Sequence, residues 1–241
     1  MTNKINLSTN VYNWWSKKSL SAQSKQITQT MIWLGGNAIY KYWFNLECQG
    51  LENLPKGEGY IIAANHNSHL DGPAIVAAHG HYMQRRVYSL AAKDYFFNQS
   101  AKAWICYHIL NMIPFNRRGK FLDCLPICKK IIAEKKAILF FPEGTRSVTG
   151  EFKPLKHGIG FLVSKLDVPV IPAYIQGTYQ SLPKGRIFPH KHPIYVYFGP
   201  PLRFEKTNNH QDKSDTRICH QKIAHDVYVA IQNLMKINLI S

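Results

Sequence analysis

A histidine and an aspartate, five residues apart, follow a short apolar run at residues 60–64. The run leads into Asn65-His66-Asn67-Ser68-His69-Leu70-Asp71. If the chain turns between them, Asp71 can bond one imidazole nitrogen of His66 and leave the other to take a proton. The spacing therefore predicts a general base with its orienting carboxylate. Because Asp71 precedes Gly-Pro and a helical stretch, a helix N-cap in a polar turn is the alternative.

The same loop also allows a metal interpretation. His66, His69 and Asp71 lie close together in the sequence, and imidazole and carboxylate are good ligands for zinc or iron. Their spacing matches no standard metal motif. A metal-dependent hydrolase that uses these three residues is nevertheless the alternative from a different functional class.

A second loop with reactive groups follows the apolar run at residues 137–141. It reads Phe141-Pro142-Glu143-Gly144-Thr145-Arg146-Ser147, which supplies a carboxylate, a flexible turn, a hydroxyl and a guanidinium. Gly144 lets the backbone approach a ligand closely, and Arg146 can grip a phosphate through two parallel hydrogen bonds. The alternative is a tight turn closed by an internal Glu–Arg ion pair.

Further cations lie near a third strand end. The segment Ile113-Pro114-Phe115-Asn116-Arg117-Arg118 closes another apolar run, and Lys153 and Lys156 lie downstream of the second loop. If these strand ends share one edge of a sheet, the cations form a pocket beside the His/Asp pair. The alternative for each cation is solvated surface.

The elements that must position these loops alternate between strand-like and helix-like runs. The predicted strands cover residues 60–64, 87–91, 112–115, 137–141, 168–175 and 194–198. The predicted helices cover residues 72–83, 99–110, 120–135, 158–166 and 215–235. Buried strands between helices predict an α/β fold, with a mostly parallel or mixed central sheet covered by helices. We assign this domain to residues 44–241.

Residues 1–43 have a different composition and predict an amphipathic helical segment at a membrane interface. Gly35-Gly36 should kink or weaken the helix, and the polar interruptions leave it too short to span a bilayer. The alternative is a helix packed on the protein's own core. Tryptophans and flanking lysines favour the interface. One helical face carries the apolar side chains Ile27, Met31, Leu34, Ala38 and Tyr42.

Composition narrows the classes of partner. The chain has 241 residues, with 30 Lys+Arg against 14 Asp+Glu and a net charge of +16, and 45% of its residues are hydrophobic. This apolar fraction excludes an intrinsically disordered chain, and the charge predicts an anionic partner. The basic residues are dispersed and no nucleic-acid recognition motif is visible, so we expect no nucleic-acid partner. No signal peptide is apparent, and the five widely spaced cysteines are expected to be reduced thiols.

Four ordered blocks resemble the glycerolipid acyltransferase family, in particular its 1-acylglycerol-3-phosphate (lysophosphatidate) acyltransferase-like branch. The first is the H-x4-D block at residues 65–71, the second is at residues 113–117, the third is the full match F-P-E-G-T-R-S at residues 141–147, and the fourth is V-P-V-I-P at residues 168–172. One departure is Asn111, where the second block usually opens with glycine. Asparagine tolerates a left-handed backbone, so we expect that turn to survive.

The resemblance implies transfer of a fatty acyl group from acyl-CoA or acyl carrier protein to a lysophospholipid hydroxyl. The expected acceptor is 1-acylglycerol-3-phosphate, which would give phosphatidic acid, and another lyso-lipid acceptor is the alternative. His66 would be the base and Asp71 its partner. No metal or prosthetic group is implied, and the expected location is peripheral or monotopic on the cytoplasmic face of an anionic membrane. The acceptor would be bound by Arg117, Glu143, Gly144, Thr145 and Arg146, with added positive potential from Lys153 and Lys156.

Overall fold

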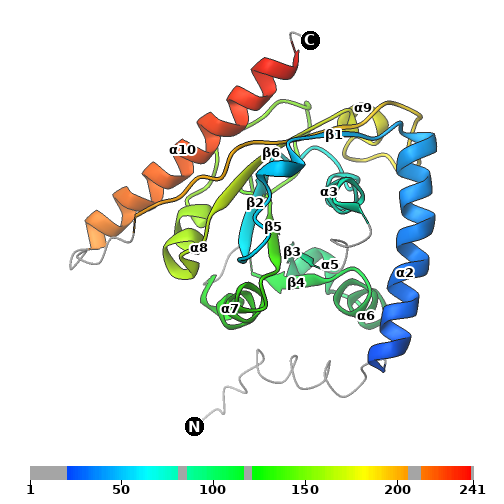
Figure 1. The fold of residues 1–241 in the computed structure, drawn as a ribbon, viewed down its shortest axis with the longest axis horizontal. Helices are drawn as coiled ribbons and strands as arrows, with labels where there is room; N and C mark the ends of the chain where they lie inside the picture. Colours follow the sequence, from blue (N-terminus) through cyan, green and yellow to red (C-terminus); the bar gives the residue numbers. More distant parts are fainter. Residues whose placement is uncertain (1–20, 81–85, 117–120, 206–212, 240–241) are drawn as a thin grey trace.

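The computed structural model describes residues 21–80, 86–116, 121–205 and 213–239 (Figure 1). These residues contain a seven-stranded sheet in the order β1-β7-β6-β2-β5-β3-β4. Neighbouring strands are parallel except for β6 and β7, which are antiparallel. The strands are β1 (Glu47–Gln49), β2 (Tyr60–Ala64), β3 (Val87–Ala92), β4 (Met112–Phe115), β5 (Ala137–Phe140), β6 (Val170–Gln176) and β7 (Tyr195–Phe198). The predicted mixed α/β class is thus confirmed.

The helices lie on both faces and at one edge of this sheet (Figure 1). They are α2 (Ala22–Ala38), α3 (Asp71–Ala78), α5 (Lys93–Phe96), α6 (Ser100–His108), α7 (Leu125–Ala133), α8 (Gly158–Leu166), α9 (Thr178–Ser181) and α10 (Lys213–Leu239). Short turns of other helix types cover Ile39–Trp43, Leu51–Asn53 and Phe121–Asp123. The six predicted strands are all present, whereas β1, α5 and α9 were not predicted.

Strand β2 explains how the two layers of helices share one sheet. All five of its residues are buried. Ile61 and Ala63 belong to the core cluster beneath α7, α8 and α10, while Tyr60, Ile62 and Ala64 belong to the cluster beneath α3. Successive side chains of a strand point to opposite faces, so an unbroken apolar run is what a strand covered on both sides requires.

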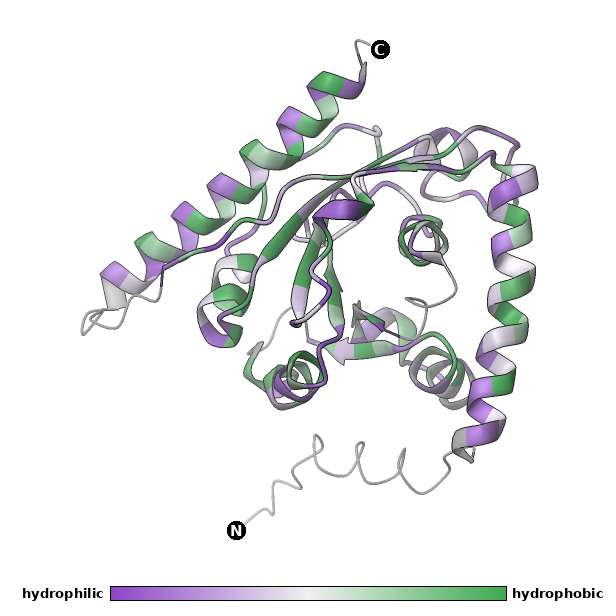
Figure 2. Ribbon diagram, viewed as in Figure 1, coloured by the Kyte–Doolittle hydropathy of each residue, from purple (hydrophilic) through white to green (hydrophobic). Residues whose placement is uncertain are grey.

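Helix α2 presents its apolar face outward. The five side chains predicted to form that face, from Ile27 to Tyr42, are all exposed. On the inner side, Tyr40 and Phe44 are buried in the core cluster beneath α3. Figure 2 shows hydrophobic and hydrophilic residues interleaved along this helix. The helix runs through Gly35-Gly36 without a break and changes to a π-helix only at Ile39.

A polar contact on the inner side fixes the orientation of α2. The Gln29 amide nitrogen donates to the backbone carbonyls of His108 and Ile109, at 3.3 and 3.1 Å, and to Asn111 Oδ1, at 3.0 Å. The helix is therefore attached to the domain through a polar group. Within the described ranges, no helix has the length and apolar character needed to cross a membrane.

Candidate active site

The predicted His/Asp pair forms at the start of α3. His66 Nδ1 donates to Asp71 Oδ2 at 2.8 Å, and the same oxygen accepts the backbone N–H groups of Asn67 and Ser68 at 2.7 and 2.8 Å. Asp71 is fully buried, while the His66 side chain is 21% exposed. Asp71 is the first residue of α3, and its bonds go to residues before the helix, so it is not the N-cap. Its carboxylate fixes the imidazole and the turn together.

The Asn65 side chain takes the place of the backbone in the sheet, so the main chain can turn away at His66. The Asn65 amide pairs with the backbone of Ile175 in β6, donating at 2.9 Å and accepting at 2.7 Å. This pair continues the β2–β6 ladder through a side chain, which leaves the main chain free to turn. The His66 backbone N–H then donates to Glu143 Oε1 at 2.7 Å, and its carbonyl accepts from the Ser147 N–H at 2.8 Å. The two loops predicted to carry chemistry are therefore bonded to each other.

The carboxyl group of Glu143 lies buried under this junction. Besides His66, the Lys153 backbone N–H donates to it at 3.4 Å. Burial raises the pKa of Glu143 to about 7, and the two backbone N–H groups oppose that rise. Glu143 thus connects the loop at residues 66–71 to the segment that follows Gly150.

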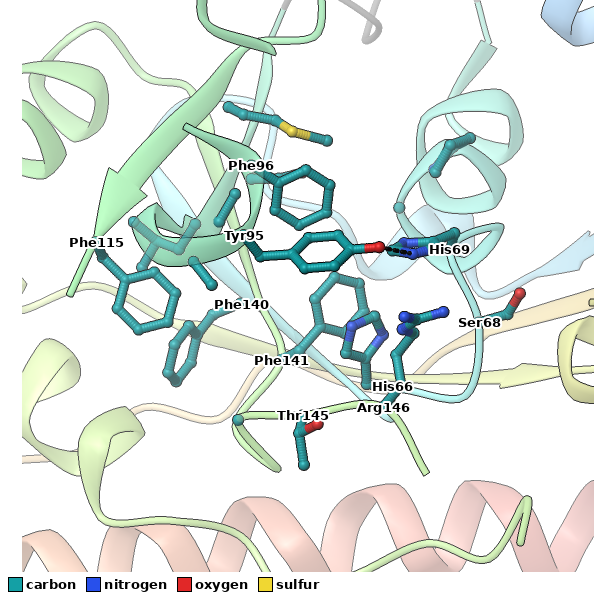
Figure 3. A pocket seen from close by; sticks show the side chains of 18 of the residues that line it. His66, Ser68, His69, Tyr95, Phe96, Phe115, Phe140, Phe141, Thr145 and Arg146 are labelled. Atoms are coloured by element: carbon teal, nitrogen blue, oxygen red, sulfur yellow. Dashed lines mark hydrogen bonds between the residues drawn. The ribbon is translucent and has the colours of Figure 1, made fainter. Parts of the chain in front are cut away.

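A cavity of about 320 Å³ opens in front of the His66 ring. Its polar end carries His66, Ser68, His69, Thr145 and Arg146, and its opposite end is aromatic and aliphatic (Figure 3). The Phe141 ring stacks on the His66 imidazole, with 4.1 Å between ring centroids. The site therefore combines a proton acceptor, a cation and an apolar chamber.

His69 faces a different partner from His66. Its Nε2 atom lies 3.1 Å from the Tyr95 hydroxyl. Burial, together with nearby Arg146, lowers the pKa of His69 to about 4, so the ring is neutral near pH 7. In the part of the chain that the structure describes, no three His, Cys, Asp or Glu side chains come together as metal ligands. The arrangement therefore does not favour the metal-dependent hydrolase.

The other predicted binding residues lie at different distances from the cavity. Gly144, Thr145 and Arg146 line it, whereas Arg117 lies outside the described residues. Gly144 has φ of +75°, and a Cβ there would lie 2.9 Å from Lys156 Nζ, so the ammonium group lies directly over this turn. Lys153 meets the site through its backbone N–H. Their roles in binding stay predictions.

The Asn111 departure is accommodated as expected. Asn111 adopts φ of +51°, the left-handed conformation that glycine would take. Its side chain is buried and accepts the hydrogen bond from Gln29. The substitution therefore keeps the turn and adds an attachment for α2.

Sequence reasoning missed three residues that shape the site. Ser68 is fully buried, and its hydroxyl donates to the Leu182 carbonyl at 2.7 Å. Lys184 lines the cavity, and Tyr95 is the partner of His69. Ser68 lies inside the first motif, but no pattern linked residues 68 and 182, which meet only through the fold.

Comparison with protein families matches residues 45–176 to the family described as Acyltransferase, which is more than half of the chain. A chloroplastic 1-acyl-sn-glycerol-3-phosphate acyltransferase of Brassica napus, BAT2, is 30% identical over 66% of this chain and 47% of its own length. The mouse 1-acyl-sn-glycerol-3-phosphate acyltransferase alpha is 26% identical over 70% of this chain and 59% of its own length. The chain thus spans about half the length of these curated relatives.

A solved structure shares the fold. The crystal structure of the 1-acyl-sn-glycerophosphate (LPA) acyltransferase PlsC from Thermotoga maritima aligns with a TM-score of 0.64 and 21% sequence identity. The alignment covers 96% of this chain and 89% of that one. The agreement extends over nearly the whole chain.

Proposed function

Since this chain belongs to the acyltransferase family, we propose that it moves a fatty acyl group from a thioester donor to the free hydroxyl of a lysophospholipid. The acceptor we propose is 1-acylglycerol-3-phosphate, which would give phosphatidic acid. The observation that carries the proposal is the 2.8 Å contact of His66 Nδ1 with the buried Asp71 carboxylate, at the polar end of a cavity whose opposite end is apolar.

The His66 ring is suited to act as a general base. Asp71 occupies Nδ1 and so leaves Nε2 as the nitrogen that takes the proton of the acceptor hydroxyl. The hydroxyl oxygen then attacks the thioester carbonyl, the thiolate of the donor leaves, and the imidazolium returns a proton to it. General-base assistance of this kind contributes roughly 10²–10⁴-fold. The steps use only side chains of this chain and the two substrates.

Cations at the polar end of the cavity support a phosphate-bearing acceptor. Arg146 lines this end beside His66, and Lys156 lies over the Gly144 turn. A guanidinium binds phosphate through two hydrogen bonds. We assign the acceptor's phosphate to this region, with Arg117 and Lys153 as further contributors.

Apolar walls support a fatty acyl group. The far end of the cavity is lined by aromatic and aliphatic side chains, including Phe96, Phe115 and Phe140. A second, more apolar cavity of about 220 Å³ lies against α2 and shares Gly72 and Met112 with the first. Burial of methylene groups is favourable by about 0.8 kcal/mol each, so these joined walls suit a long hydrocarbon chain. The donor thioester is carried by either acyl-CoA or acyl carrier protein.

The outward apolar face of α2 supports attachment to a membrane. In α2 the polar side chain of Gln29 faces the domain, while Ile27, Met31 and Leu34 are exposed. Contact of these apolar side chains with water is unfavourable. Such a face suits burial in the headgroup region of a bilayer, and a charge of +16 suits an anionic leaflet. We propose a peripheral or monotopic location on the cytoplasmic face, where both donors are found.

The decisive experiment is a panel of lysophospholipid acceptors assayed with acyl-CoA and with acyl carrier protein, with products identified by mass spectrometry. We expect phosphatidic acid from the phosphate-bearing acceptor. Hydrolysis of the thioester without acylated lipid in any combination would refute the proposal.

One variant tests the acceptor site. Arg146→Ala should slow use of 1-acylglycerol-3-phosphate by roughly 10–150-fold, the cost of a lost charge-assisted hydrogen bond. Transfer to a phosphate-free monoacylglycerol is the control and should fall much less. Equal losses on both acceptors would indicate a structural role for Arg146 instead.

A further inference from the structure

Residues 183–191 form an exposed loop between α9 and β7, which we call the tip loop. Its two large apolar side chains, Ile187 and Phe188, are 83% and 81% exposed, the highest values among the exposed large hydrophobic residues of the described chain. Two adjacent side chains of this size in water are costly unless another surface covers them.

The charge around these two side chains has a single sign. Lys184, Arg186 and Lys191 flank them in the tip loop, and no Asp or Glu occurs anywhere in residues 168–204. Cations that surround an apolar tip match a surface that is apolar inside and anionic outside. An anionic phospholipid bilayer has that structure.

Hydrogen bonds hold the tip loop in shape. The His190 backbone N–H donates to the Ser181 carbonyl at 2.7 Å, and the Arg186 N–H donates to the Pro183 carbonyl at 3.2 Å. The Arg186 guanidinium also contacts the His190 ring. Ile187 and Phe188 are therefore presented by a closed loop with internal support.

The chain segments on either side of the tip loop lie near the C-terminal end of α2. Where the chain leaves the loop, the Ile194 N–H donates to the Phe44 carbonyl at 2.9 Å, directly after the exposed side chains of Tyr42 and Trp43. In Figure 1, α9, which precedes the loop, lies near the C-terminal end of α2. The tip loop is thus connected to the chain at the C-terminal end of the apolar face of α2.

Residues that adjoin each surface are bonded to the loop at residues 66–71. From α2's side, the Tyr40 hydroxyl donates to the Leu70 carbonyl at 2.8 Å. From the tip loop's side, the Leu182 carbonyl accepts from the Ser68 hydroxyl at 2.7 Å. These two contacts connect residues 66–71 to the chain segments next to both surfaces. Lys184 of the tip loop also lines the cavity.

We propose that the tip loop is a second membrane-inserting element, in which Ile187 and Phe188 enter an anionic bilayer and Arg186 and Lys191 contact its phosphates. Together with α2 it provides two attachment points, which set the orientation of the cavity mouth toward the lipid. The inference rests on the proposed action at a membrane, but its test measures binding and not acyl transfer.

The test is flotation of the full-length protein with vesicles of phosphatidylglycerol or phosphatidylcholine. Ile187→Ser combined with Phe188→Ser should lower the partition coefficient on both vesicles at least about tenfold. The matched control, Ile218→Ser with Ile237→Ser, removes two exposed apolar side chains from α10 and should leave binding unchanged. Partitioning of the tip-loop variant equal to wild type would overturn the proposal.

Four further measurements complete the test. Arg186→Gln with Lys191→Gln should weaken binding to phosphatidylglycerol by roughly fivefold per cation and leave phosphatidylcholine binding unchanged. Unchanged binding to both kinds of vesicle would overturn the proposal.

If the serine variant fails to fold, the variant Phe188→Trp tests insertion instead. Indole prefers the membrane interface, so this variant should bind vesicles more tightly than the wild type, and equal or weaker binding would refute insertion. A lipid-free wild-type dimer that the serine variant converts to monomer would assign the loop to contacts between copies. Acyl transfer to a soluble short-chain acceptor should persist in the tip-loop variants. A loss of vesicle binding in these variants can therefore be distinguished from a loss of acyltransferase activity.

Discussion

The imidazole of His66 is oriented by a carboxylate that also holds the turn, and this sets the expected ranking of substitutions. His66→Ala should lower the rate of transfer by at least 100-fold with little change in melting temperature, because only the base is lost. Asp71→Asn should lower both the rate of transfer and the melting temperature, since Asp71 Oδ2 accepts hydrogen bonds from three donors.

His69→Ala is the matched control for the same loop. His69 pairs with Tyr95 and not with Asp71, so we expect its loss to reduce the rate by less than about tenfold, well short of the loss of a general base. Steady-state kinetics and thermal melts of the three variants check this order. An active His66→Ala enzyme beside an inactive His69→Ala enzyme would show that the base is assigned wrongly.

Because the carboxyl group of Glu143 is buried, we expect the free energy of unfolding to depend on pH. Its pKa is raised to about 7 in the folded state, so the folded state binds the proton more tightly than the unfolded state does. The stability that this proton provides is present below the unfolded pKa, near pH 4.5, and is lost as pH rises toward 7.

Comparison of the wild type with the variant Glu143→Gln isolates the contribution of this proton to the free energy of unfolding. From pH 4.5 to pH 8 the free energy of unfolding of the wild type should fall relative to the variant, by as much as about 3 kcal/mol. A constant offset between the two proteins is expected in addition, because the amide cannot accept both backbone N–H groups. Urea unfolding at several pH values measures the difference, and a difference independent of pH would mean that Glu143 titrates normally.

At the scale of elements, the contact between α8 and α10 depends on one glycine. A Cβ on Gly160 would lie 2.3 Å from the His220 carbonyl oxygen and 2.5 Å from its Cα, both backbone atoms that cannot move aside cheaply. Gly160→Ala should therefore push the helices apart and cost about 1–3 kcal/mol. In α2, a Cβ on Gly35 would meet nothing within 4 Å, so Gly35→Ala should be neutral or stabilising by up to about 1 kcal/mol. Chemical denaturation of both variants tests the contrast; equal effects would contradict the close packing.

At the scale of the whole molecule, the orientation of α2 decides how membrane docking must be tested. Tyr40 is buried in the core, so deletion of residues 1–43 would damage the domain as well as any docking surface. Replacing Ile27, Met31 and Leu34 with serine changes only exposed side chains. This triple variant should bind anionic vesicles at least about tenfold more weakly and keep its melting temperature.

Salt and extraction separate the contributions to that binding. High salt should weaken wild-type binding without abolishing it, because only the electrostatic part is screened. Wild-type protein that stays in solution with anionic vesicles would contradict docking by α2. Resistance to both alkaline and high-salt extraction would favour a deeper insertion than the interface.

Features set by short stretches of chain were predictable from the sequence. Strand β2 occurs at the predicted residues because an unbroken apolar run is itself the signal of a strand buried on both faces. The His66–Asp71 pair and the left-handed turn at Asn111 were also accessible, since each depends on residues within one turn of chain. Strand β1, by contrast, is the short polar segment Glu-Cys-Gln and carries no such signal.

Only the tertiary structure decided how remote segments meet. The bond from Ser68 to Leu182, the support of His66 by Glu143, and the inward turn of Gln29 toward Asn111 join residues far apart in the chain. Such contacts depend on strand order and helix orientation, which periodicity along the sequence does not encode. The apolar face of α2 was visible in the sequence as a helical stripe, but whether it packs on the core or faces outward depends on which side the domain offers a partner. Here the buried Asn111 side chain provides that partner on the polar side, and the apolar stripe is left exposed.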